Sequence, residues 1–474
     1  MTAGHGCVLP PPEILSQIIL LVPRETRRSC LLVSRLFHDL AITVVFSRIT
    51  IQIGAWEYWY HNESHSSETF RPHENRRATL AADILHRITV DTGFARRVRR
   101  LEIIAHKHGG SNDDCVFQLH CLSLAVQNLV NLRSLIWYGT RPVPSLEIVE
   151  MLAKACPLLL PVNVLSVRPH SIRSIAFTGT HLNLWEDYHH HISNYATIDV
   201  HGGSLREICI PAMWAGSIQP DSLPNLTHLE LLFLPSECLA TLETLLGQLP
   251  QLQSFAISSI DDQAHSLLHA LASSFEHNTR LTSLAVLDYT REYRLTPEDL
   301  QVLSDFLSNR QGLRRLRLAY ICPWLYHRQY LDIISTLKNL EVLWLVFKAR
   351  RFTRDIMGSL ARCLPSSLAA LGFLLHAPVV EAGSFHPIWM SCRQLEYFHV
   401  RSHALMESVE DAIAGAGTLK VAGRNGRLHS IEYPQGIPVV SDHWPQDMVM
   451  FRREEMYGCP GWEWLTRHSP MYAN

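Results

Sequence analysis

The sequence predicts an α/β fold: a short N-terminal helical segment followed by an irregular solenoid with a curved parallel sheet inside and helices on the convex side. Two observations predict this class. One six-residue apolar pattern recurs along most of the chain, and amphipathic segments of helical length fill the gaps between its copies. A single strand–helix unit cannot bury its own apolar face, so consecutive units are expected to stack.

The recurring pattern is apolar-x-x-apolar-x-apolar, as in "LTHLEL" and "LRRLRL". It occurs at residues 98–103, 132–137, 172–177, 205–210, 226–231, 252–257, 281–286, 313–318, 340–345, 368–373, 395–400 and 428–433. From Leu226 to Leu395 its copies start 26 to 32 residues apart. This is the strand signature of a leucine-rich repeat, in which the two close apolar residues point inward and their neighbours point outward.

Predicted helices return the chain between strands. They cover 239–250, 261–275 and 296–309, and the last begins with Thr296 as a candidate N-cap and Pro297 at the first helical position. The asparagine of regular leucine-rich repeats, which forms hydrogen bonds after the strand, is missing, so the units are expected to be irregular. The alternative to a solenoid is a compact α/β domain.

Composition restricts the class of protein. The 474 residues are 47% hydrophobic with a formal net charge of -2, which favours neither nucleic acid nor a membrane surface as partner. Eleven cysteines are scattered without a CxxC pair and indicate reduced thiols in an intracellular protein. The apolar N-terminal stretch is interrupted, and no basic residues precede it, so neither a membrane span nor a signal peptide is expected. We expect a cytoplasmic or nuclear location.

The N-terminal segment reads as short amphipathic helices. Pro10 to Pro12 with Glu13 form a suitable helix start, Pro23 ends that helix, and Ser34 is a candidate N-cap for the next. These helices are too small to bury all their apolar side chains among themselves. Either a partner covers them or they pack on the end of the solenoid as a cap.

This segment resembles an F-box. The resemblance lies in "LPPPEIL", "LVP" and "LLVSRLFHDLA", in that order between Leu9 and Ile51. Phe37 stands where the family has tryptophan, and Thr26, Arg27 and Arg28 stand where it prefers leucines, so the motif looks like a degenerate fungal-type F-box. An F-box followed by leucine-rich repeats is similar to the substrate receptors of SCF-type cullin–RING ubiquitin ligases.

The resemblance implies partners and site residues. The F-box would bind a Skp-type adaptor, and through it a cullin, while the repeats would bind a protein substrate. The implied adaptor-binding residues are Leu9, Pro10, Ile14, Leu15, Ile18, Leu32, Val33, Leu36 and Phe37. The alternative is a leucine-rich-repeat interaction scaffold whose N-terminal helices only cap the solenoid.

No motif indicates catalysis or a cofactor. GxSxG, P-loop, GxGxxG and kinase motifs are absent from the sequence. Histidines cluster in 187–193 and in "HNESH" at 61–65, which leaves a metal-dependent hydrolase as an alternative from another class. Arginine clusters lack interleaved aromatic residues, so we do not expect nucleic-acid binding. The prediction is a non-enzymatic protein without cofactor or metal.

Counting along the later strands predicts the substrate-binding side chains. Alternate residues point away from the core, and this rule selects Arg315, Arg317, Trp344, Tyr397 and His399. Tryptophan, tyrosine and arginine dominate binding hot spots, so we assign substrate binding to these five residues. The alternative is that Trp344 packs beneath a loop of the chain itself.

The predicted domain order has four parts. Residues 8–51 form the F-box-like helical domain, 52–95 a polar loop and connecting helix, 96–434 the solenoid, and 435–474 a C-terminal capping segment. The connecting helix is expected at 78–88. The aromatic tail is expected to fold over the last repeat, because open solenoid ends need a cap; the alternative is a peptide motif that another protein binds.

Overall fold

The computed structural model describes residues 10–22, 24–53, 71–106, 116–141, 146–156, 174–176, 206–212, 223–234, 236–259, 264–274, 280–288, 294–323, 326–349, 351–376, 379–402, 408–444 and 459–466. The chain divides into two compact units, Met1–His191 and Ile192–Asn474. Among the described residues, none of the helices has the length and apolar character needed to cross a membrane.

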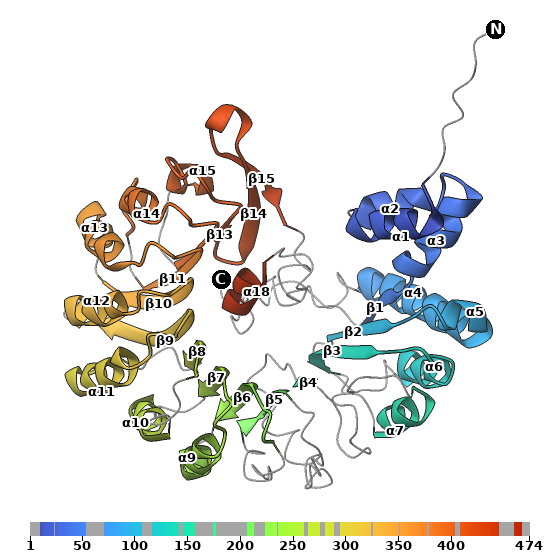
Figure 1. The fold of residues 1–474 in the computed structure, drawn as a ribbon, viewed down its shortest axis with the longest axis horizontal. Coiled ribbons are helices and arrows are strands. Elements are labelled where there is room, and N and C mark those ends of the chain that lie inside the picture. Colours follow the sequence, from blue (N-terminus) through green and yellow to red (C-terminus); the bar gives the residue numbers. More distant parts are fainter. Residues whose placement is uncertain are drawn as a thin grey trace. The chain divides into compact units, whose positions relative to one another are not determined.

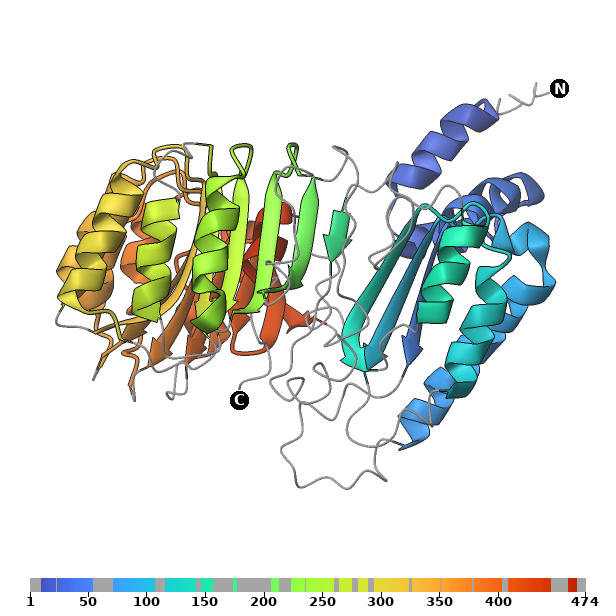
Figure 2. The same ribbon diagram turned by 90° about the horizontal axis from the view of Figure 1, so that it is seen from below.

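The first unit contains a parallel sheet in the order β1-β2-β3. Its strands are β1 (Arg48–Ile53), β2 (Arg100–His106) and β3 (Ser134–Arg141); the short strand β4 (Ser174–Ala176) is not part of this sheet. Its helices are α1 (Pro12–Leu21), α2 (Arg24–Cys30), α3 (Arg35–Val45), α4 (Arg71–Val90), α5 (Thr92–Ala95), α6 (Val116–Val126) and α7 (Leu146–Ala155). Figure 2 shows helices of this unit alongside its strands on one face of the sheet.

Strand β1 is the first repeat strand. Alternate residues Ile49, Ile51 and Ile53 point into the core of this unit, against α4. The predicted F-box-like domain, residues 8–51, included most of this strand. Yet Phe46 to Ile51, "FSRITI", keeps the apolar-x-x-apolar-x-apolar pattern. The backbone N–H groups of Arg99 and Arg100 both donate to the carbonyl of Ser47, at 2.8 and 2.9 Å, which fixes the pairing.

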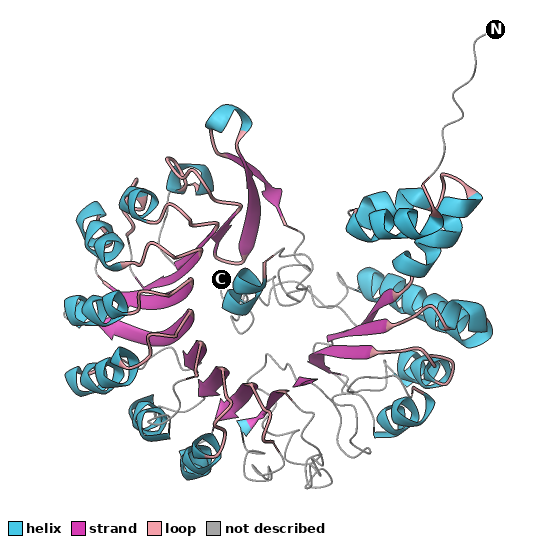
Figure 3. Cartoon of the chain, viewed as in Figure 1, coloured by secondary structure: helices cyan, strands magenta, loops and turns pink. Residues whose placement is uncertain are grey.

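The second unit is a long parallel-dominated sheet covered by helices on one face (Figures 1 and 3). Its strands are β5 (Glu207–Pro211), β6 (His228–Leu234), β7 (Ser254–Ser259), β8 (Ser283–Asp288), β9 (Arg315–Pro323), β10 (Val342–Lys348), β11 (Ala370–His376), β12 (Tyr397–Ser402), β13 (Val421–Arg424), β14 (Arg427–Glu432) and β15 (Val439–His443). Strands β5 to β13 run parallel.

Helices connect these strands. They are α9 (Leu239–Gly247), α10 (Ala264–Ser274), α11 (Pro297–Ser308), α12 (His327–Thr336), α13 (Arg354–Cys363), α14 (His386–Ser391), α15 (Val409–Ala412) and α18 (Pro460–Thr466), with the 3-10 turns η6 (Ser236–Cys238) and η8 (Pro434–Gly436). Thr296 caps α11 in a capping box with Asp299, as the sequence predicted. The helices at 239–250, 261–275 and 296–309 are confirmed to within a few residues.

The core of the second unit lies between the sheet and the helices α9 to α14. Alternate strand residues such as Leu316, Leu343 and Phe398 are fully buried on this side. Phe398 meets Phe385 and Trp389 in edge-to-face contacts, with ring centroids 5.2 and 4.7 Å apart. The two close apolar residues of each pattern therefore point into the core, as the period of two requires.

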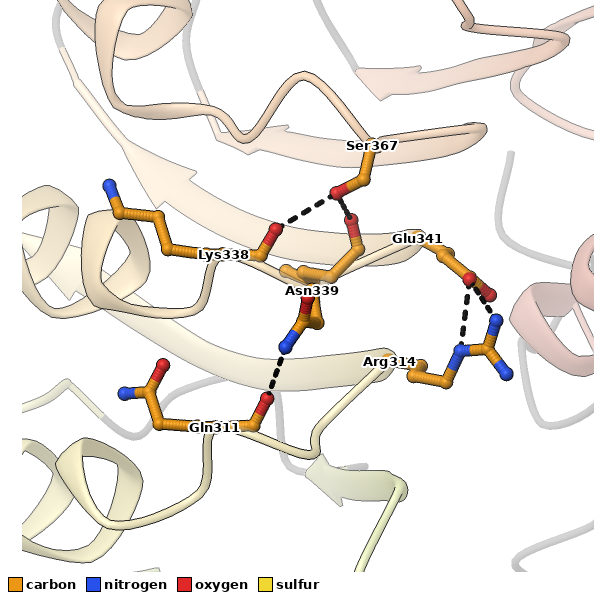
Figure 4. Close-up of polar contacts among 7 residues, drawn as sticks. Gln311, Arg314, Lys338, Asn339, Glu341 and Ser367 are labelled. Atoms are coloured by element: carbon orange, nitrogen blue, oxygen red, sulfur yellow. Dashed lines mark hydrogen bonds and ion pairs between the residues drawn. The ribbon is translucent and has the colours of Figure 1, made fainter.

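Neighbouring repeats are joined at the turn that precedes each strand (Figure 4). The Asn339 side chain donates to the carbonyl of Gln311 at 2.8 Å, and the Ser367 hydroxyl donates to the carbonyl of Leu340 at 2.8 Å. The backbone N–H groups of Glu341 and Val342 both donate to the carbonyl of Arg314. The chain thus forms side-chain bonds before the strand, where a regular repeat has an asparagine ladder after it.

The prediction that 428–433 forms the last parallel strand of the repeats is wrong. This segment forms β14, which pairs antiparallel with β13 and starts a hairpin. The last parallel strand is β13, and its pattern is broken because Arg424 stands at the last apolar position, level with Val400 of β12. Gly423 is required: a Cβ there would lie 2.6 Å from Cδ2 of His399. The hairpin β14–β15 continues the sheet beyond this strand.

Candidate protein-interaction surfaces

The face of the sheet opposite helices α9 to α14 carries the predicted substrate-binding residues. In register, Arg315, Val342, Ala370 and Tyr397 form one row across four strands. Arg317, Trp344, Gly372 and His399 form the next row. We call this surface, from β9 to β12, the concave face. All five predicted residues lie on it, and the register that brings them together follows from the strand pattern.

Large rings on this face lie over glycines of the neighbouring strand. The Trp344 ring covers Gly372 of β11 so closely that a Cβ at that position would overlap it. The His399 ring lies in the same way beside Gly423 of β13. The guanidinium of Arg317 is 5.0 Å from the centroid of the Trp344 ring, a cation–π distance. The row is therefore closely packed from Arg317 to Gly423.

His399 is held neutral by its surroundings. Its Nε2 is 2.6 Å from the carbonyl oxygen of Asn425, which can only accept, so Nε2 carries the proton. Its Nδ1 then accepts from the Tyr397 hydroxyl at 3.2 Å. Complete burial lowers the pKa of His399 to about 3, and the charges of Arg401 and Arg317 act in the same direction.

The C-terminal helix α18 covers this row. Figure 1 shows α18 on the face of the sheet opposite α9 to α14, and it packs against β10 and β11. The Trp462 ring lies 5.7 Å from the Tyr397 ring, and Arg317 donates a hydrogen bond from Nη1 to the carbonyl of Leu465. Trp344, Tyr397 and His399 are consequently 2%, 0% and 0% exposed. Arg315 remains half-buried.

The segment 435–474 was predicted to fold over the last repeat, and its described parts differ. Strand β15 extends the sheet beyond the last parallel strand, β13, whereas α18 lies elsewhere. Helix α18 packs on β10 and β11 in the middle of the sheet, whereas β13 is followed by its own hairpin. A signal for this packing is present in the sequence, since Trp462, Trp464 and Leu465 form a compact apolar cluster near the end of the tail. The sequence does not indicate which strands this cluster packs against. The expectation that Trp344 packs beneath the chain itself fits this arrangement, with a helix as the cover.

The N-terminal helices leave apolar side chains in solvent. Leu15 and Ile19 of α1 are buried, as is Ala41 of α3, and α3 contacts both α1 and α2. In contrast, Leu21 is 84% exposed and Leu32 is 90% exposed. Further exposed apolar residues of this segment are Ile14, Ile18, Leu20, Val33 and Leu36. We call this set, with Leu21 and Leu32, the head surface.

The predicted adaptor-binding residues divide accordingly. Ile14, Ile18, Leu32, Val33 and Leu36 are exposed on the head surface, and Pro10 is also exposed. Phe37 is half-buried, Leu15 is buried, and Leu9 lies outside the described residues. Leu20 and Leu21 were not selected from the sequence, although they continue the apolar run of α1.

Two side chains shape the ends of these helices. Ser34 accepts a hydrogen bond from the Phe37 N–H at 3.3 Å, so it caps α3 as predicted. Arg27 donates from Nε to the carbonyl of Val22 at 2.8 Å and from Nη2 to the carbonyl of Leu20 at 3.0 Å. These carbonyls have no partner within the helix, because they end it. The arginine that departs from the F-box pattern therefore completes the C-terminus of α1.

The histidine clusters that suggested a metal site are not among the residues that the structure describes. The histidines of 187–193 and of 61–65 lie outside the described residues. Within the part of the chain that the structure describes, no group of three or more His, Cys, Asp and Glu side chains is placed to hold a metal ion.

The repeated strand–helix unit, the parallel sheet and the helices on one face define a solenoid of the leucine-rich-repeat kind. No protein-family model matches the sequence. No curated protein matches it either. Among solved structures it is similar to the leucine-rich repeat-containing protein LegL7 from Legionella pneumophila, at 12% identity over 69% of this chain and 91% of that chain, with a TM-score of 0.34. A protein from Bacteroides fragilis matches at 10% identity over 67% and 68%, with a TM-score of 0.25.

Proposed function

We propose that this chain is the non-enzymatic substrate receptor of an SCF-type ubiquitin ligase. In this proposal α1 to α3 bind a Skp-type adaptor, and through it a cullin, while the repeats bind the protein to be modified. The support comes from the resemblance of residues 9–51 to an F-box and from the repeat fold, whose role in protein interaction is common. The transfer chemistry would belong to the other subunits.

The head surface is the single observation that carries this proposal. Ile14, Ile18 and Leu21 follow each other at helical spacing on one stripe of α1. Burying a side chain of this size is worth about 1.5–3 kcal/mol, so a helix pair that leaves several of them in water gains from a partner. The head retains its own small core of Leu15 and Ile19, which leaves the exposed stripe available for binding.

A pull-down of the full chain with a Skp-type adaptor tests the proposal. Substitution of Ile18→Asp together with Leu32→Asp should remove adaptor binding, because two charges would be buried at the contact. Both residues are exposed, so the head should stay folded; Leu15→Asp would instead disrupt it. The matched control is Leu80→Asp, which changes a leucine on α4 of the same unit that is 51% exposed, close to the 46% of Ile18.

A leucine-rich-repeat scaffold without ligase recruitment is the second candidate. One observation favours it: β1 follows α3 directly, and Phe46 at the end of α3 packs on Phe94 of α5, with ring centroids 5.3 Å apart. The helices are therefore continuous with the first repeat, as a cap would be. Adaptor binding that is absent in the wild-type chain would support the scaffold, whereas binding that is unchanged in the double variant would exclude the head surface as the adaptor contact.

A further inference from the structure

Helix α18 packs on the concave face, although the opposite face of the sheet already packs against helices α9 to α14 in a buried core. Buried residues of that core, such as Leu316, Leu343 and Phe398, lie on the opposite side of the sheet. The concave face holds a separate buried cluster. From β10 to β12 it includes Val342, Trp344, Val346, Ala370 and Tyr397, and from α18 it includes Trp462, Trp464 and Leu465; Val421 of the adjoining strand β13 packs with them.

The contacts of α18 resemble those of a bound peptide. The Trp462 ring contacts the Tyr397 ring at a tilt of 30°, and Gly461 lies against Val342. The carbonyl of Leu465 accepts from Arg317, which is 148 residues away in sequence. A cation near the C-terminus of a helix is favoured by the helix dipole. Side chains fix one end of this short helix, and a hydrogen bond fixes the other.

The concave face has the composition of a binding site. Arg317 and Arg401 are 3% and 6% exposed on it, beside His399 at 0%. Burying such groups costs free energy unless they are paired, so a sheet face that served only packing would favour apolar residues. Tryptophan, tyrosine and arginine side chains are the types that dominate binding hot spots.

We propose that the concave face of β9 to β12 is the site at which the repeats bind a partner protein, and that α18 occupies it intramolecularly in competition with that partner. The partner is a short helix with two aromatic side chains at positions i and i+2 and an apolar one at i+3, as in Trp462, Trp464 and Leu465. This inference rests on the proposed function, because it assigns the substrate-binding surface of the receptor.

Competition determines how the site works. A tethered segment acts at an effective concentration on the order of millimolar, so a free helix of equal affinity binds weakly while α18 is in place. The apparent affinity for a partner falls in proportion to the fraction of molecules in which the face is open. A partner with a carboxylate where α18 has the Leu465 carbonyl would compete best, because that hydrogen bond to Arg317 would be charge-assisted.

Fluorescence anisotropy with the full chain tests this proposal. The probe is a labelled peptide of residues 459–466 carrying Cys459→Ser. We expect the variant with Trp462→Ala and Trp464→Ala to bind the probe at least about tenfold more tightly than the wild-type chain, since α18 no longer holds the face. Adding Arg317→Ala should weaken that binding about tenfold or more. The matched control, Arg328→Ala, changes an exposed arginine on α12 and should have no effect.

A second variant guards against misfolding. Gly461→Leu keeps both tryptophans, but its Cβ would lie 3.2 Å from Cγ2 of Val342, so it should displace α18 and raise probe affinity. Equal probe binding by wild type and both variants, or no binding by folded variants, would overturn the proposal. If both variants unfold, α18 is part of the solenoid core and the proposal also fails.

The failure of this inference is separable from that of the proposed function. The variants with Ile18→Asp and Leu32→Asp should bind the probe as the wild-type chain does, whereas adaptor binding should survive Arg317→Ala. Probe binding without adaptor binding would leave the concave face assigned and remove only the ligase role.

Discussion

The ring of Trp344 lies on the backbone of Gly372, its register neighbour on the next strand. The tryptophan can lie flat along the sheet only because the neighbouring position has no Cβ. Its other neighbour in the row, Arg317, stacks its guanidinium on the ring at 5.0 Å. On the concave face, a large side chain on one strand thus packs over a glycine on the next strand.

Substitution of Gly372→Ala should destabilise the second unit. The added methyl group would overlap the Trp344 ring and force it from its position, and overpacking of this kind costs about 1–3 kcal/mol. Urea denaturation measures the change. The matched control is Gly358→Ala in α13, where the nearest atom to the new Cβ is 4.0 Å away and alanine should stabilise the helix by up to about 1 kcal/mol. Equal effects at the two glycines would contradict the packing argument.

The buried His399 should make stability depend on pH. Its pKa is about 3 in the folded chain and about 6.5 when unfolded, so the unfolded state binds a proton first as pH falls. The stabilisation that comes from neutral, buried His399 is therefore fully present above pH 6.5. Below that pH the free energy of unfolding falls by about 1.4 kcal/mol per pH unit, until the pH approaches 3. From pH 6.5 to 5 this amounts to about 2 kcal/mol. Urea denaturation at several pH values measures it.

The His399→Gln variant provides the control for that prediction. Glutamine can still donate to the carbonyl of Asn425, but it does not titrate. The pH dependence of this variant between 6.5 and 5 should be smaller than that of the wild-type chain by about 2 kcal/mol. The same slope in both proteins would show that other groups cause it.

The repeat architecture could be predicted from the sequence because it depends on local patterns. Leucines at fixed spacing marked the strands of the second unit, and Thr296 and Ser34 marked the helix starts where the structure places them. Two of the parallel strands were missed for opposite reasons. β1 had the pattern but was assigned to the F-box-like domain, whereas β13 lacks it because Arg424 stands where Val400 stands in β12.

The candidate site was predictable only in part. Alternation along each strand placed Arg317, Trp344 and His399 in one row, and parallel register aligned them. That α18 would cover this row depends on a contact between residues 148 positions apart, which no local pattern encodes. The role of Arg27 was also hidden, because its hydrogen bonds go to backbone carbonyls rather than to a sequence partner.

Removal of the Arg27 side chain should loosen the end of α1. The Arg27→Ala variant leaves the carbonyls of Leu20 and Val22 without this donor, and we expect a loss of about 1 kcal/mol in local stability. Hydrogen exchange of the amides in residues 12–22 measures the change. Arg35→Ala, at an exposed position of α3, is the matched control. In that variant the amides of residues 12–22 should exchange at the wild-type rate.

The turn between repeats should contribute measurably to the stability of the second unit. The Asn339→Ala variant removes the hydrogen bond to the carbonyl of Gln311, and a bond of this kind is worth about 0.5–1.5 kcal/mol. Lys338→Ala is the control, because this neighbouring exposed side chain lies in the same turn while its carbonyl still accepts from Ser367 at 3.1 Å. If the two variants lose equal stability in urea denaturation, the side-chain bonds before the strands do not hold the repeats in register, and the backbone pairs at Arg314 suffice.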